Sequence, residues 1–112
     1  MSQLHTPSVV ENLQKLIGEE KFSVILSSSR ASLEGIISEL KSAYTDSDHE
    51  TMRRAAHSIK SSVGNYGADP VSKKAEELEH KYKAQDLGNA ASEIEELDGL
   101  VQGLLTELET YL

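Results

Sequence analysis

The sequence predicts an all-α protein: an antiparallel up-down-up-down four-helix bundle with a short N-terminal capping helix. Three observations support this fold class. Apolar residues recur along most of the chain at the three- and four-residue spacing of amphipathic helices. Short polar or glycine-containing segments separate these stretches, and none of them alternates like a β-strand. The length of 112 residues suits one domain, so residues 1–112 are expected to fold as a single unit.

The N-terminal half supplies the capping helix and the first two bundle helices. Residues 7–17 carry apolar side chains on one side and are expected to lie across one end of the bundle. Residues 1–18 would then cap a bundle formed by residues 19–112. A helical apolar stripe extends from residue 22 to residue 44, and Thr, Asp and Ser at residues 45–48 offer N-caps for the next helix. That helix carries its stripe from Met52 to Tyr66, and Gly67 is expected to close it.

The C-terminal half supplies two more helices. Asp69 and Pro70 resemble an N-cap followed by proline at the first helical position. The helix that follows has apolar residues from Val71 to Tyr82 and is expected to end near residues 86–88. The last helix is expected to begin at about Asn89, and its acidic cluster at residues 93–96 is expected to be a solvated face. Four helices joined by short turns are typical of an antiparallel bundle.

Composition excludes several classes of function. Eleven basic and nineteen acidic side chains give a formal net charge of -8. A chain of this charge is unsuited to nucleic acid, whose binding depends on neutralising phosphates, or to an anionic membrane surface. The sequence has no cysteine, so it can form neither a disulfide nor a thiolate metal site. Without a signal-peptide pattern or an apolar run of about 20 residues, we expect a cytoplasmic protein, and a monomer.

His57 stands on the solvent side of its expected helix, about 140° from the direction of the apolar stripe on a helical wheel. Arg53, Lys60, Ser61 and Gly64 share its face, because residues three, four and seven apart are neighbours on a helix. Arg54 lies a little further round. Cations are thus gathered around one exposed histidine in a strongly acidic chain. A glycine within the helix would cost roughly 1 kcal/mol relative to alanine, so Gly64 is expected to serve a purpose other than helix stability.

The residues around His57 favour one kind of chemistry. Neither a carboxylate nor a second histidine lies three or four residues away, so the sequence offers no orienting acid for a general base and no second metal ligand. An imidazole nucleophile flanked by Lys60 and Arg53 suits an anionic electrophile, and phosphoryl transfer depends mainly on positioning and charge stabilisation. Neighbouring cations also favour the neutral, nucleophilic imidazole. His5, His49 and His80 lack this setting and are expected to be ordinary surface histidines, with His5 in a frayed terminus.

The segment AHSIKSSVGNYGAD, residues 56–69, closely resembles the signature of histidine-containing phosphotransfer (HPt) domains, His-x-Leu-Lys-Gly-x-x-Gly-x-x-Gly-Ala. His57 matches the phosphorylated histidine, Lys60 the motif lysine and Gly64 the small residue one turn further on. Three departures are mild: Ile59 replaces leucine, Ser61 replaces glycine, and Tyr66 stands at a usually aliphatic place. The segment KKAEELE, residues 73–79, is also similar to the family's next helix, where a Leu-Glu pair is common. The resemblance covers about residues 20–110.

This resemblance implies a phosphorelay intermediate with a four-helix-bundle fold. His57 would accept a phosphoryl group, usually on Nε2, from the aspartyl phosphate of a receiver domain in a hybrid sensor kinase. It would then pass the group to the receiver Asp of a response regulator. Lys60 would stabilise the phosphoryl group, and Arg53, Arg54, Ser61 and Gly64 would contact the receivers. The Mg²⁺ and its carboxylate ligands belong to the receivers, so no cofactor is expected on this chain, which would be a carrier without kinase activity.

Two other functions remain open on the residues alone. A helical adaptor could bind a signalling partner without phosphotransfer, although the combination of His57, Lys60 and Gly64 argues against a lost activity. A bundle with its own kinase or phosphatase activity would need a nucleotide-binding glycine-rich loop, which the sequence lacks. The Met1 start and a length close to that of the fold favour a stand-alone protein over an excised domain of a hybrid kinase.

Overall fold

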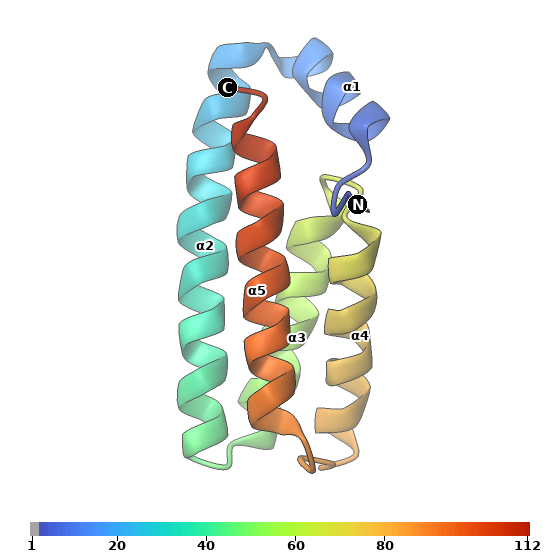
Figure 1. Ribbon diagram of the computed structural model, residues 1–112. Helices are drawn as coiled ribbons and strands as arrows, with labels where there is room; N and C mark the ends of the chain where they lie inside the picture. Colours follow the sequence, from blue (N-terminus) through green and yellow to red (C-terminus); the bar gives the residue numbers. More distant parts are fainter. Residues whose placement is uncertain (1–2) are drawn as a thin grey trace.

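The computed structural model describes residues 3–112 as five helices, shown in Figure 1. Residues 1 and 2, which belong to the expected cap of residues 1–18, lie outside the described residues. The helices are α1 (Pro7–Ile17), α2 (Glu19–Thr45), α3 (His49–Gly64), α4 (Asp69–Lys83) and α5 (Ala90–Glu109). No strand occurs in the described part of the chain. Among these helices, none is both long and apolar enough to cross a membrane.

Helices α2 to α5 form the antiparallel up-down-up-down bundle that the sequence predicts (Figure 1). Helix α3 packs against α2 and α4, and α5 packs against the same two helices, so α3 and α5 lie diagonally opposite each other. The core consists of the apolar stripes of all four helices and of buried residues such as Phe22, Leu40, Ile59, Leu78 and Leu104. Burial of these stripes, rather than helix propensity, holds the helices together.

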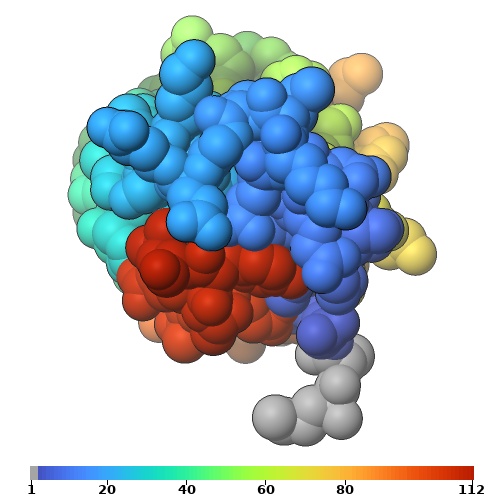
Figure 2. Space-filling model, turned by 90° about the horizontal axis from the view of Figure 1, so that it is seen from above, coloured from blue at the N-terminus to red at the C-terminus, as the bar shows by residue number. Residues whose placement is uncertain are grey.

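Helix α1 caps one end of the bundle, with Val10 fully buried beneath it and Leu16 exposed to solvent. Figure 2 shows this end, where the N-terminal segment lies over the ends of the longer helices. The expectation that residues 7–17 form a capping helix is therefore confirmed.

The prediction for His5 is wrong. His5 is buried, and its Nδ1 lies 2.6 Å from Glu107 Oε1 while its Nε2 lies 2.7 Å from the Tyr111 hydroxyl. The backbone N–H groups of Leu4 and His5 also donate to the Glu107 carboxylate. The N-terminal segment is thus anchored to the end of α5. Sequence reasoning could not find this pairing because the partners are more than a hundred residues apart.

The ends of α2, α3 and α4 share one backbone geometry, in which a residue two or three positions beyond the helix has a positive φ. After α3, the N–H of Ala68 donates to the carbonyl of Val63 and that of Gly67 donates to Gly64, which is a Schellman motif. Gly67 takes φ = 61°, and a Cβ there would lie 2.8 Å from the Thr6 side chain. Gly67 closes the helix as predicted, and it has two physical reasons to be glycine. Ser47 and Gln85 hold the same position after α2 and α4 with φ of 55° and 59°.

Three local predictions differ from the structure. Asp69 is the first residue of α4 rather than its N-cap, which is Ala68, and no side chain caps this end. Helix α4 ends at Lys83, before the expected residues 86–88, because the positive φ of Gln85 stops it. Glu93 is buried instead of solvated, because Lys81 Nζ on α4 approaches its carboxylate to 2.6 Å.

Candidate functional site

His57 lies on the outer face of α3, and half of its side chain is exposed (54%). Its Nδ1 lies 2.9 Å from Oε2 of Glu79 on α4. The other oxygen of the same carboxylate, Oε1, accepts a hydrogen bond of 3.0 Å from Nζ of Lys60. One largely buried carboxylate, 16% exposed, therefore holds both residues that the sequence singled out.

Glu79 is the residue of this candidate site that sequence reasoning missed. The sequence shows no acid three or four residues from His57, and the structure brings one in from the next helix. His57 and Glu79 each lie eleven residues from Ala68, at the centre of the α3–α4 turn. Positions at equal distance from a tight turn face each other in an antiparallel helix pair, so this symmetry was the signal available in the sequence.

The electrostatics of Glu79 favour its charged form. Burial acts to raise the pKa of the Glu79 carboxyl. The hydrogen bonds from Lys60 and His57, together with the charges of these two residues, have a larger effect in the opposite direction, so the pKa is lowered. Glu79 is therefore a carboxylate at neutral pH and can only accept hydrogen bonds. The proton between Glu79 and His57 must then lie on Nδ1, and in the neutral ring Nε2 carries the lone pair.

The two arginines expected near His57 behave differently. Arg53 forms an ion pair one turn along α3 with Glu50, at 2.5 Å from Nη2 to Oε1, which raises the pKa of Arg53. It does not reach His57 as a free cation. Arg54 is exposed, and its nearest polar contact is a long one, 3.5 Å to the Thr51 hydroxyl.

Ser61 and Gly64 are both exposed on the face of α3 that carries His57. Gly64 is the last residue of α3 rather than an interior one, so the expected helix penalty is smaller than for a mid-helix glycine. A Cβ built at Gly64 has no heavy atom within 4 Å. Packing within the chain therefore does not require glycine at this position.

Beside this face, α2 and α3 enclose a shallow hollow of about 220 Å³. It is lined by small polar residues and one exposed isoleucine: Ile25, Ser28, Ser29, Ser32, Ser62 and Asn65. No group of three or more potential metal ligands occurs within residues 3–112.

Comparison with known proteins shows the family to which this chain belongs. The Hpt domain family matches residues 24–110, which is most of the chain, so the chain belongs to the Hpt domain family. It is a histidine phosphotransfer protein, an intermediate of a phosphorelay, and Hpt proteins work with receiver domains in two-component systems.

A solved structure has the same fold. The crystal structure of histidine-containing phosphotransfer protein B (HptB) from Pseudomonas aeruginosa PAO1 matches with a TM-score of 0.89 and 23% sequence identity. The match covers 98% of this chain and 95% of the HptB chain. No curated protein matches this chain.

Proposed function

We propose that His57 is the residue that carries the phosphoryl group and that Nε2 is its nucleophile. One observation carries this proposal: the Glu79 carboxylate accepts a hydrogen bond from the Nδ1–H group of a half-exposed His57. The ring is thereby held in one orientation and one tautomer, with the Nε2 lone pair available to a partner. A fixed tautomer of this kind is a common requirement for a histidine nucleophile.

In the transfer step, the receiver supplies both the phosphoryl group and the leaving group. The Nε2 lone pair forms a bond to phosphorus as the bond between phosphorus and the receiver's aspartyl oxygen breaks, and the Asp leaves as a carboxylate. The imidazole gains positive charge during this step because Nδ1 still carries its proton. Glu79 offsets that charge across a 2.9 Å hydrogen bond, and the reverse step returns the lone pair to Nε2.

Lys60 is proposed to stabilise the phosphoryl oxygens. Its ammonium has three donors, and the Glu79 carboxylate accepts from one of them at 3.0 Å. The remaining donors stay available for oxygens that arrive beside His57. Glu79 therefore positions Lys60 as well as the imidazole.

The receivers are proposed to dock over α3 and the adjacent face of α2. Gly64 and Ser61 leave room for close approach, the hollow beside Ile25 adds apolar and small polar surface, and Arg54 is free to contact acidic groups. We propose that one partner is the receiver of a hybrid sensor kinase and the other that of a response regulator. This chain would act as a cytoplasmic, monomeric carrier without kinase activity or a cofactor of its own, since Mg²⁺ is held by the receivers.

The test is a transfer assay with phosphorylated receiver domains, with radiolabelled ATP alone as the control. Wild-type protein should gain label from a receiver and not from ATP, and the label should be acid-labile and stable to mild base, as in a phosphoramidate. His57→Gln should keep its helicity and melting temperature and gain no label, whereas His80→Gln, which retains His57, should still gain acid-labile label. Labelling of His57→Gln would refute the assignment. Label from ATP alone would indicate an enzyme, and no label from any receiver would indicate an adaptor.

A further inference from the structure

The surface between the first half of α3 and the second half of α4 is hollowed in two adjoining places. The larger hollow, about 440 Å³, is lined by His49, Glu50, Arg53, Tyr82, Lys83 and Gln85. The smaller, about 190 Å³, is lined by Arg53, Lys60, Glu79, His80 and Lys83. Because they share Arg53 and Lys83, the two hollows form one groove, here called the α3–α4 groove. It begins at the Lys60–Glu79 pair beside His57.

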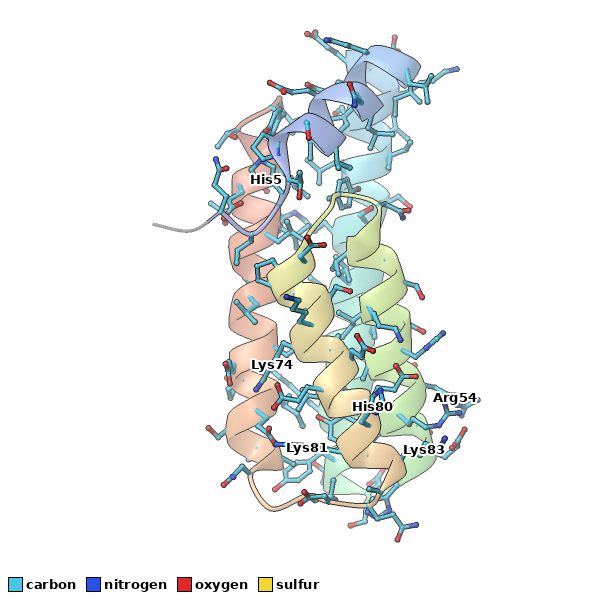
Figure 3. The ribbon with its side chains drawn as sticks, turned by 90° about the vertical axis from the view of Figure 1, so that its right-hand side faces the viewer. His5, Arg54, Lys74, His80, Lys81 and Lys83 are labelled. Atoms are coloured by element: carbon cyan, nitrogen blue, oxygen red, sulfur yellow. The ribbon has the colours of Figure 1, made fainter. Side chains whose placement is uncertain are left out.

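The α3–α4 groove has an excess of positive charge in a chain whose net charge is -8. Its two carboxylates are already paired, Glu50 with Arg53 and Glu79 with Lys60. Lys83 forms no ion pair with any residue from 3 to 112. Figure 3 shows Lys83 at the same end of the α3–α4 face as His80 and Arg54, which add further basic groups around the groove.

Arg53 and Lys83 face each other across this groove. Each lies fifteen residues from Ala68, the centre of the α3–α4 turn, and both line both hollows. Two like charges opposite each other weaken the helix pair, and Glu50 neutralises only Arg53. Lys83 lies in the last turn of α4, where a cation is favourable to the helix dipole, but no carboxylate of residues 3–112 pairs with it. Its ammonium is therefore available to an incoming anionic group, which would also relieve the repulsion from Arg53.

We propose that the α3–α4 groove binds acidic side chains of the receiver domain and so orients the receiver while its aspartyl phosphate meets His57. This inference rests on the proposed phosphotransfer function. The receiver is the proposed occupant because it must lie over His57 during transfer, and the groove starts beside that histidine at Lys60 and Glu79. Acidic side chains at the edge of the receiver would complement the unpaired cation of the groove. Charge complementarity of this kind acts mainly on the association rate and weakens with salt.

The test compares Lys83→Glu with a matched control, Lys73→Glu. Lys73 is exposed on the same helix, forms no ion pair within residues 3–112, and lies ten residues, or about 15 Å, from Lys83 along the helix. Receiver domains from the genome that encodes this chain are first phosphorylated with acetyl phosphate. The probe is the one among them that transfers its phosphoryl group to the wild-type protein fastest. At about 50 mM salt, Lys83→Glu should lower the second-order transfer rate about tenfold, Lys83→Gln should lower it less, and Lys73→Glu should stay within about twofold of wild type.

Two further readouts isolate the docking role. The Lys83→Glu deficit should disappear as salt rises toward about 1 M, where the Debye length is about 3 Å. Labelling by phosphoramidate, which needs no docking surface, should be the same in all variants. A wild-type transfer rate for Lys83→Glu, an equal loss in Lys73→Glu, or an equal loss of phosphoramidate labelling would each overturn the proposal. Because wild-type labelling at His57 is measured in the same experiment, failure of the groove proposal is distinguishable from failure of the proposed function.

Discussion

The glycine at position 64 provides the sharpest test of how receivers reach His57. Seven residues separate the two, so Gly64 lies about 10 Å from His57 along α3 and about 20° from it around the helix axis. A specific interface buries about 800 Å² on each partner, and a circular patch of that area has a radius of about 16 Å. Any receiver centred on His57 therefore covers Gly64.

A side chain at position 64 should raise the stability of the protein and lower the rate of phosphoryl transfer from a receiver. A Cβ there meets no heavy atom within 4 Å, and the residue is the last of the helix, so Gly64→Ala should stabilise the protein by up to about 0.5 kcal/mol, or about 2 °C in melting temperature. A methyl group added at a closely packed interface costs about 1 kcal/mol or more, so transfer from a receiver should fall about fivefold. Gly64→Gln should lower it at least thirtyfold.

The matched controls are Gly99→Ala and Gly99→Gln. Gly99 is also exposed and helical, with no heavy atom within 4 Å of a built Cβ, but it lies on α5, diagonally opposite α3. These variants should gain stability and transfer at the wild-type rate. Melting curves, receiver transfer and phosphoramidate labelling would be measured on all four. Unimpaired receiver transfer by Gly64→Gln would refute the close-approach argument, and lower melting temperatures with weaker phosphoramidate labelling would indicate an internal packing role instead.

Three further predictions follow from the site and its turn. Lys60→Ala should slow transfer about ten- to a hundredfold with a smaller loss in receiver binding, because it removes a charge-assisted contact to the phosphoryl group; a wild-type transfer rate would make Lys60 a bystander. Glu79→Gln should move the His57 ring protons toward a mixture of tautomers, measured by ¹⁵N NMR. Because the pKa of Glu79 is lowered on folding, its stabilising contribution is present above the usual carboxyl pKa and lost as pH falls through the lowered value. The stability difference between wild type and Glu79→Gln should therefore shrink at acid pH, and a difference that stayed constant in urea titrations would contradict this. Gly67→Ala should destabilise the protein by more than about 1 kcal/mol, because φ is 61° and Thr6 lies too close; an unchanged urea midpoint would argue against both constraints.

The sequence alone determined the helices, the capping segment and the exposure of His57. Each of these depends on periodicity within one stretch of chain, and a helix of known pitch fixes which residues share a face. The motif around His57, Lys60 and Gly64 lies within two turns of α3, so it could be recognised without knowing what packs beside it. The end of α4 was predicted too late in the chain, because Gln85 takes a positive φ and a residue other than glycine gives no clear signal for that conformation.

Only the tertiary structure decided which side chains meet between helices. Glu79 reaches His57 and Lys60 because the α3–α4 turn sets the register of two antiparallel helices, and a shift of one residue would rotate Glu79 by about 100° away from both. His5 meets Glu107 and Tyr111 for the same kind of reason, since the N-terminal segment crosses the end of the bundle where α5 ends. Local periodicity says which way a side chain points on its own helix. The partner it meets depends on the packing of the whole bundle.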